Sequence, residues 1–212
     1  MFRITSHHSN KELRMRAQIA QDAARIMAEE GVNDFHAAKR KAAARLGASD
    51  TRNMPRNVEI EAALRDYQRI FQGDSHAASL ERLRESAQQA MRYFEQFQPR
   101  LFGSVLKGTA GGHSDINLQL FADTPEEVLL FLMEQEVPFE SGERMLRFSE
   151  EQEQLFPSYR ILANEVSIEL VVLPLKAIRQ PPLSPVDGRP MERASLNRLT
   201  ALMVQEEAEL PG

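Results

Sequence analysis

Two oxygen-bearing side chains open an alternating stretch of the sequence, residues 114–121. Asp115 and Asn117 are separated by one apolar residue, and the residues after them continue to alternate polar with apolar. In a β-strand, residues two apart project to the same side, so these two side chains would share one face. Carboxylate and amide oxygens are ligands that Mg²⁺ accepts. The stretch therefore predicts a strand that packs one face on a core and offers metal ligands on the other.

A third candidate ligand, Glu169, lies in a second apolar stretch, residues 166–172. Its apolar residues alternate, which leaves Glu169 on the opposite face together with Ser167. A lone charge in such a strand needs a partner or a metal ion. Glu169 is either a ligand that the fold brings beside Asp115 or part of the exposed face of an edge strand. We favour the first interpretation because a glycine–serine step, Gly103-Ser104, lies upstream.

The order of these residues resembles the signature of the nucleotidyltransferase superfamily, which includes DNA polymerase beta and the bacterial antibiotic adenylyltransferases. That signature is an apolar residue, Gly, Gly or Ser, a gap, and then acid–apolar–acid–apolar. Phe102-Gly103-Ser104 matches its first half, and Asp115-Ile116-Asn117-Leu118 matches its second half. Residues 105–114 are the gap. The resemblance covers residues 101–121 directly, together with the strand that carries Glu169.

The resemblance implies a bacterial, metal-dependent enzyme that transfers a nucleoside monophosphate from a nucleoside triphosphate to an acceptor. In this family carboxylates on neighbouring strands hold divalent ions. By analogy, Asp115, Asn117 and Glu169 would be the catalytic and metal-binding residues, with Mg²⁺ as the ion. Gly103 would let the backbone approach the nucleotide closely, and Ser104 would hold a phosphate oxygen. Lys107 would either contact phosphate or be a solvated lysine.

One position departs from the family pattern, since Asn117 stands where the second acid is expected. An amide keeps one oxygen ligand but removes a negative charge, and it bridges two ions poorly. Two hypotheses follow. The chain is an enzyme with weakened metal binding that uses one ion, or it is a catalytically weak or inactive descendant that binds a nucleotide, a nucleic acid or a protein.

A basic segment, residues 36–56, contains one acidic residue, Asp50. Beside a nucleotidyltransferase-like core, such a surface would fit an acidic partner such as a nucleic acid, or a protein acceptor. Alternatively, these cations pair with the acidic helices around them, which is the interpretation that we favour. The basic residues are Lys39, Arg40, Lys41, Arg45, Arg52 and Arg56.

The composition of the 212-residue chain is that of an ordinary globular protein, with 42% hydrophobic and 27% charged residues. A formal net charge of -5 argues against a protein coated with nucleic acid. The absence of cysteine excludes disulfides, thiolate chemistry and cysteine-based zinc sites. The sequence has neither an apolar run long enough to span a bilayer nor a secretion signal at its start. We therefore expect a cytoplasmic protein that does not bind membranes.

The first half of the chain predicts helices. Apolar residues repeat at helical spacing, and Gly73-Asp74-Ser75 is expected to separate the third helix from the fourth. The expected helices cover residues 11–30, 34–46, 58–72 and 77–97. Residues 1–97 are therefore expected to form a helical N-terminal region, a small bundle.

Beyond Pro99 the pattern changes to strands and short helices. Thr124 and Glu127, on either side of Pro125, form a capping box that predicts a helix. Strands are expected at 100–102, 114–121, 144–148, 159–163 and 166–173, and a proline-rich segment at 174–191 leads into a last helix over 192–207. The fold class is α+β: a helical bundle followed, over residues 98–212, by a nucleotidyltransferase-like mixed-sheet domain with a C-terminal helix.

Overall fold

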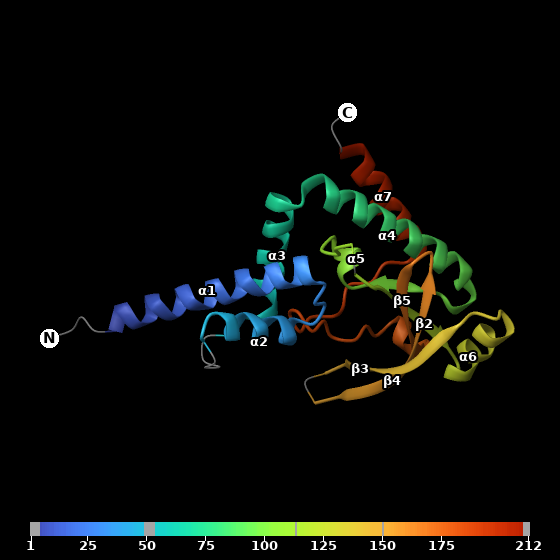
Figure 1. Cartoon of the computed structure of the whole chain (residues 1–212). Helices are drawn as coiled ribbons and strands as arrows, with labels where there is room; N and C mark the ends of the chain where they lie inside the picture. Colours follow the sequence, from blue (N-terminus) through green and yellow to red (C-terminus); the bar gives the residue numbers. More distant parts are fainter. Residues whose placement is uncertain (1–4, 49–53, 113, 150, 210–212) are drawn as a thin grey trace. The chain divides into compact units, whose positions relative to one another are not determined.

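The computed structural model describes residues 5–48, 54–112, 114–149 and 151–209 (Figure 1). The chain forms two compact units. The first comprises residues 1–76 with 185–187, and the second comprises residues 77–184 with 188–212. The boundary that composition suggests between two domains, after residue 97, stays a prediction.

In its described residues the first unit is built on helices. Its helices are α1 (Thr5–Glu30), α2 (Phe35–Arg45), α3 (Asn57–Phe71) and the first residues of α4 (Gly73–Tyr93). Asp34 caps α2, where its Oδ1 accepts a hydrogen bond of 2.6 Å from the backbone N–H of Ala37. The core combines alanines, which allow close helix packing, with isoleucines: Ile19, Ala20, Ala23, Ile26, Ala38, Ala42, Ala43 and Ile60. The predicted helices are present, and α1 starts six residues before the expected Lys11.

The break expected at Gly73-Asp74-Ser75 is wrong in detail. The chain leaves α3 at Phe71, and α4 already begins at Gly73. Gly73 has a positive φ of 32°, which glycine adopts readily, and the polar residues after it form the first turn of the next helix. The expected C-terminal end of this helix, Phe97, lies in a separate 3₁₀ turn, η2 (Glu95–Phe97).

The second unit contains a five-stranded mixed sheet in the order β1-β2-β5-β4-β3. The strands β2 and β5 are parallel, and the other neighbours are antiparallel. The bounds are β1 (Arg100–Phe102), β2 (Ile116–Ala122), β3 (Phe139–Arg147), β4 (Glu153–Ala163) and β5 (Val166–Pro174). The α+β class with a mixed sheet is confirmed.

Two strands are longer than the sequence predicted. β3 starts at Phe139 instead of Arg144, and β4 starts at Glu153 instead of Tyr159. The turn between β4 and β5 is where the sequence placed it. Asn164 and Glu165 have φ angles of 49° and 64°, as the tight hairpin turns that match strand twist require.

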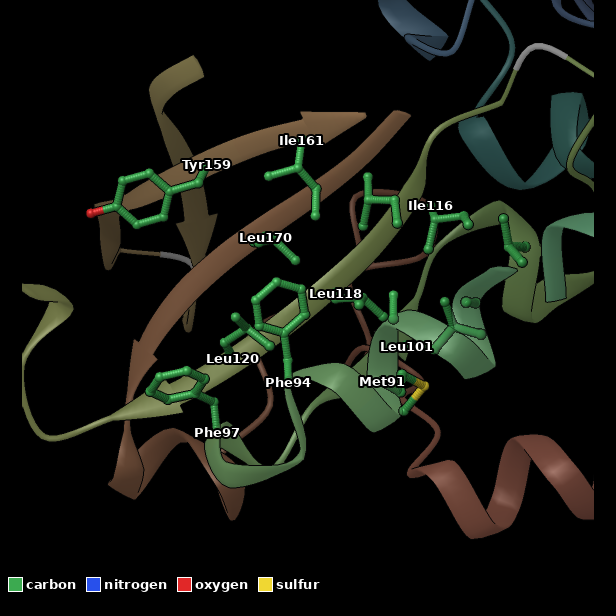
Figure 2. Close-up of a cluster of buried hydrophobic side chains, with 14 of the residues drawn as sticks. Met91, Phe94, Phe97, Leu101, Ile116, Leu118, Leu120, Tyr159, Ile161 and Leu170 are labelled. Atoms are coloured by element: carbon green, nitrogen blue, oxygen red, sulfur yellow. The ribbon is translucent and has the colours of Figure 1, made fainter. Parts of the chain in front are cut away.

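Helices cover one face of the sheet (Figure 2). Along with α4, they are α5 (Ser104–Lys107), α6 (Pro125–Glu134) and α7 (Leu196–Glu209). α6 begins with the predicted capping box, in which the Thr124 N–H donates to Glu127 Oε1 at 2.9 Å. Residues that contribute to this core include Leu83, Met91, Phe94, Val105, Ile116, Leu118, Leu120, Leu132, Ile168, Leu170 and Leu199.

The opposite face of the sheet is apolar only along part of its strands. There Phe102, Phe121, Leu146, Phe156, Val171 and Leu173 pack with Ala177 of η3 (Leu175–Ile178), in the segment that follows β5. The start of the proline-rich segment is therefore held on the sheet. Nearer the starts of β2 and β5, the same face carries polar side chains.

In the described part of the chain, no helix combines the length and the apolar character that crossing a membrane requires.

Candidate functional site

The pairing of three strands determines which predicted residues meet. Asn117 on β2 is paired with Phe102 on β1 and with Glu169 on β5. Directly opposite residues in a sheet project to the same face. The structure therefore brings Asn117 and Glu169 side by side, with Gly103 next to them at the end of β1.

Asp115 lies immediately before β2, two residues from Asn117, and is half-buried. The Asn117 Nδ2 group donates a hydrogen bond of 3.3 Å to the backbone carbonyl of Asp115. This bond turns the amide nitrogen of Asn117 toward the chain and ties the two predicted ligands together. The strand was expected from residue 114 but begins at Ile116, so Asp115 is positioned by the loop before β2 as well as by the sheet.

The turn at Gly103 fits closely against Asn117. Gly103 has φ 83° and ψ -153°, a conformation that is essentially restricted to glycine. A Cβ atom here would stand 3.3 Å from Asn117 Nδ2. Ser104 follows as the first residue of α5, and Lys107 is the last residue of this four-residue helix. The predicted phosphate-contacting residues thus occupy both ends of α5, and Gly103 and Ser104 lie at the end nearer to Asn117.

Arg84 holds α5 in place from the neighbouring helix α4. Its guanidinium is 3% exposed and donates from Nε to the Val105 carbonyl at 3.1 Å and from Nη2 to the Leu106 carbonyl at 3.3 Å. Its Nη1 group pairs with Glu206 of α7. A buried arginine thus satisfies carbonyl groups at the end of α5, which a helix leaves without internal partners.

Glu169 has a partner that the sequence analysis did not find. Arg144 of β3 donates from Nη1 to Glu169 Oε2 at 2.8 Å, and the Glu169 side chain is 11% exposed. The lone acid in β5 did signal that a partner was needed. The sequence could not name it, because Arg144 lies two strands away and the register of β3 on β4 is not visible in the residue pattern.

The residues at this end of the sheet include side chains of the types that bind a divalent ion. Asp115 and Glu169 supply carboxylates and Asn117 supplies an amide oxygen, which matches the one or two carboxylates by which Mg²⁺ is commonly held beside phosphates. Among the residues that the structure describes, no group of three His, Cys, Asp or Glu side chains could hold a metal ion. A metal site formed by Asp115, Asn117 and Glu169 stays a prediction.

A cavity of about 250 Å³ opens beside Asp115 in the second unit. It lies among α4, the loop before β2 and the turn between β4 and β5. Its polar lining residues include Arg82, Ser114, Asp115, Asn164, Glu165 and Ser167. The cavity gives Asp115 a second polar neighbourhood, separate from its bond to Asn117.

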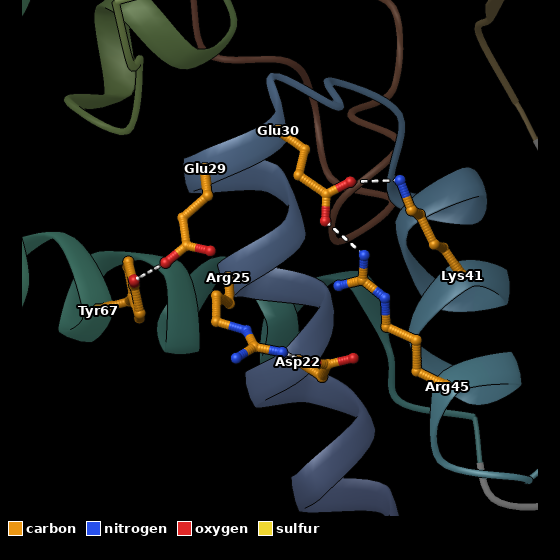
Figure 3. Close-up of polar contacts among 7 residues, drawn as sticks. All are labelled: Asp22, Arg25, Glu29, Glu30, Lys41, Arg45 and Tyr67. Atoms are coloured by element: carbon orange, nitrogen blue, oxygen red, sulfur yellow. Dashed lines mark hydrogen bonds and ion pairs between the residues drawn. The ribbon is translucent and has the colours of Figure 1, made fainter.

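Three of the six basic residues predicted to bind a partner form ion pairs within the first unit. Lys41 and Arg45 both bind the carboxylate of Glu30, the latter at 2.7 Å (Figure 3). Arg56 pairs with Glu59 at 3.5 Å. Desolvation by burial lowers the pKa of the Lys39 ammonium. Arg40 is exposed, and Arg52 lies outside the described residues. These pairs agree with the interpretation in which the cations form ion pairs with acidic residues around them. A nucleic-acid or protein partner stays a prediction.

Comparisons of the chain with family models, with curated proteins and with solved structures yielded no match.

Proposed function

We propose that the chain binds a nucleoside triphosphate with Mg²⁺ and transfers its nucleoside monophosphate to an acceptor hydroxyl, as nucleotidyltransferases do. The strand register carries the proposal, because Asn117 is opposite both Phe102 and Glu169. That register gathers the glycine turn, the Asp115-Asn117 segment and the acid of β5 at one end of one sheet face. These are the residues on which the resemblance to the family depends.

In such a transfer the acceptor oxygen attacks the α-phosphorus, and the bond between this phosphorus and the leaving pyrophosphate breaks. The proton of the acceptor hydroxyl passes to a general base. Asp115 and Glu169 are carboxylates at the site that can take this proton or bind a metal ion. A bound Mg²⁺ would stabilise the charge on the phosphate oxygens. Asn117 contributes a neutral oxygen, so we expect slow transfer.

A second candidate function is nucleotide binding without transfer. Two observations favour it: the amide at position 117, and the ion pair that already neutralises Glu169. Both reduce the negative charge available to divalent ions. In this case the fold would hold the triphosphate, and the chemical step would be lost.

Calorimetry with ATP, GTP, CTP and UTP, with and without Mg²⁺, tests both candidates together with an assay of pyrophosphate release. The informative variants are Asp115→Asn and Asn117→Asp. Asp123→Asn is a matched control, because Asp123 is an exposed aspartate just after the other end of β2.

The enzyme proposal predicts Mg²⁺-dependent binding and pyrophosphate release that Asp115→Asn abolishes and Asp123→Asn leaves unchanged. Binding without release, with release appearing in Asn117→Asp, would support the second candidate. If neither the parent chain nor Asn117→Asp binds any of the four nucleotides, both candidates are wrong.

A further inference from the structure

Arg144 and Glu169 form an ion pair in which one partner is buried and the other reaches solvent. The side chain of Glu169 is 11% exposed and that of Arg144 is 44% exposed. A guanidinium has five N–H donors, and the bond to Glu169 uses a hydrogen on Nη1. Arg144 therefore neutralises the acid while part of its cationic surface stays accessible to an anion.

The side chain of Arg144 reaches Glu169 diagonally across β4, past Ser158, because Phe156 is opposite Arg144 and Arg160 is opposite Glu169. Arg144 is on β3, Glu169 is on β5, and β4 lies between them. On this face β4 presents Ser158 opposite Gly142 of β3, and a Cβ atom at Gly142 would stand 3.2 Å from Ser158 Oγ. A larger residue at either position would occupy the space above β4 through which Arg144 reaches Glu169.

We propose that Arg144 is the anion-binding residue of this site, exchanging Glu169 for the phosphate groups of a polyphosphate ligand. The inference rests on the proposed function for the identity of the ligand as a nucleoside triphosphate. Glu169 is opposite Asn117 on the neighbouring strand, roughly 5 Å away, so phosphates held near Asn117 would lie about one strand spacing from the guanidinium bound to Glu169. Guanidinium groups bind phosphate through paired, charge-assisted hydrogen bonds.

Separating Arg144 from Glu169 costs free energy, and binding of a cation at Glu169 can offset this cost. When Arg144 leaves, the buried carboxylate of Glu169 loses its ion pair, which is unfavourable, and Arg160, opposite Glu169 on β4, is the cation that remains beside it. A divalent ion at Glu169 removes that penalty. Polyphosphate and Mg²⁺ are therefore expected to bind cooperatively, each favouring the state in which Arg144 and Glu169 are separated.

The test uses inorganic tripolyphosphate as the probe, alongside ATP, in calorimetry with and without Mg²⁺. The variants are Arg144→Gln, Glu169→Gln and the double variant Arg144→Gln/Glu169→Gln, in which neither charge is left unpaired. Arg147→Gln is the control, with the same change of charge on the same strand. Far-UV circular dichroism establishes that each variant is folded.

Arg144→Gln is expected to weaken tripolyphosphate binding roughly 10- to 100-fold, the value of a charge-assisted contact, and Arg147→Gln to leave it unchanged. Glu169→Gln frees Arg144 from its partner, so tripolyphosphate should bind more tightly without Mg²⁺ and depend less on Mg²⁺. The double variant should bind as weakly as Arg144→Gln. Arg144→Gln that is folded and binds tripolyphosphate as tightly as the parent chain would overturn the inference.

The outcomes separate this inference from the proposed function. If tripolyphosphate binds through Arg144 and no nucleotide binds, the anion exchange stands and the proposed function is wrong. If ATP binds with Mg²⁺ and its affinity is the same in Arg144→Gln, the proposed function stands and the exchange is wrong. If the parent chain binds neither ligand, both are wrong.

Discussion

The side-chain nitrogen of Asn117 lies against the backbone of Gly103, so that a Cβ atom on Gly103 would stand 3.3 Å from it. This separation is tighter than an ordinary van der Waals contact. The contact joins the end of β1 to the first polar residue of β2, and it depends on a glycine with φ 83° and ψ -153°. The turn at Gly103 thus depends on a residue without a side chain.

Gly103→Ala should destabilise the protein by about 1–3 kcal/mol, because alanine is strained in this backbone region. It should also displace Asn117, which the new methyl group would contact. Urea denaturation measures the first effect, and the NMR chemical shift of the Asn117 side-chain amide measures the second. Gly112→Ala is the matched control, since a Cβ atom there meets Ser79 Oγ at an ordinary 3.8 Å. Equal losses of stability in the two variants would contradict the prediction.

Arg84 links α5 to the C-terminal helix through Glu206. Arg84→Met should lower the free energy of unfolding by about 2–4 kcal/mol, because the carbonyls of Val105 and Leu106 lose a buried donor. Glu206→Gln should cost about 1 kcal/mol or less, since the Glu206 side chain is 49% exposed and solvent screens the pair. Urea unfolding of both variants tests this order. Gln205→Ala, at an exposed neighbouring position, should have little effect.

The carboxylate of Glu59 makes the stability of the first unit depend on pH. Arg16 donates to Glu59 Oε1 from Nε at 3.0 Å, and this hydrogen bond holds the pKa of Glu59 below its ordinary value. A carboxyl whose pKa is lowered by folding contributes stability above its unfolded pKa, and this contribution is lost as the pH falls through the folded pKa. The first unit should therefore lose stability on acidification below the ordinary range of a glutamate.

Glu59→Gln should lower stability at neutral pH and reduce the loss on going from neutral pH to about pH 3.5. Hydrogen exchange of amides in α1 and α3, measured on the full chain at both pH values, reports the local effect. Asp66→Asn is the control, because it removes an exposed carboxylate of the same helix. A parent chain and Glu59→Gln with the same pH dependence would show that the Arg16 bond has no such role.

Local signals in the sequence were sufficient to predict most elements. The capping box at Thr124 and Glu127, the alternation in β2 and β5 and the turn at Asn164-Glu165 are all properties of neighbouring residues, and each predicted element is present. The failures occurred where local pattern is weak. β3 is mostly exposed and carries charges along its length, so its first half has no apolar alternation that would predict a strand.

The part of the candidate site that depends on the alternation of side chains along a strand was predictable. Alternation places Asn117 and Glu169 each on the polar face of its strand, and the parallel pairing of β2 with β5 then brings them together. The contribution of β3 was not predictable. Arg144 meets Glu169 only because β4 and β3 pair in one particular register, which depends on the whole sheet.

Arg193 links the segment that follows β5 to the face of the sheet opposite to the one that the helices cover. Its guanidinium donates to Gln119 Oε1 at 2.9 Å, to the Ala177 carbonyl at 3.0 Å and to the Ile178 carbonyl at 2.8 Å, and Gln119 is fully buried. Burial lowers the pKa of this guanidinium, as does the nearby Arg100. The arginine thus acts as the shared donor for three acceptors.

Arg193→Met should destabilise the protein by about 2–4 kcal/mol, because these acceptors lose their donor. Adding Gln119→Leu should recover part of the loss, since the double variant no longer buries the side-chain oxygen of Gln119 without a partner. Arg198→Met, which removes a 56% exposed side chain, should cost less than about 1 kcal/mol. Urea unfolding of these variants and of Gln119→Leu alone is the measurement. A double variant whose loss of stability equals the sum of the losses in Arg193→Met and Gln119→Leu would show that Gln119 stabilises the sheet independently of Arg193.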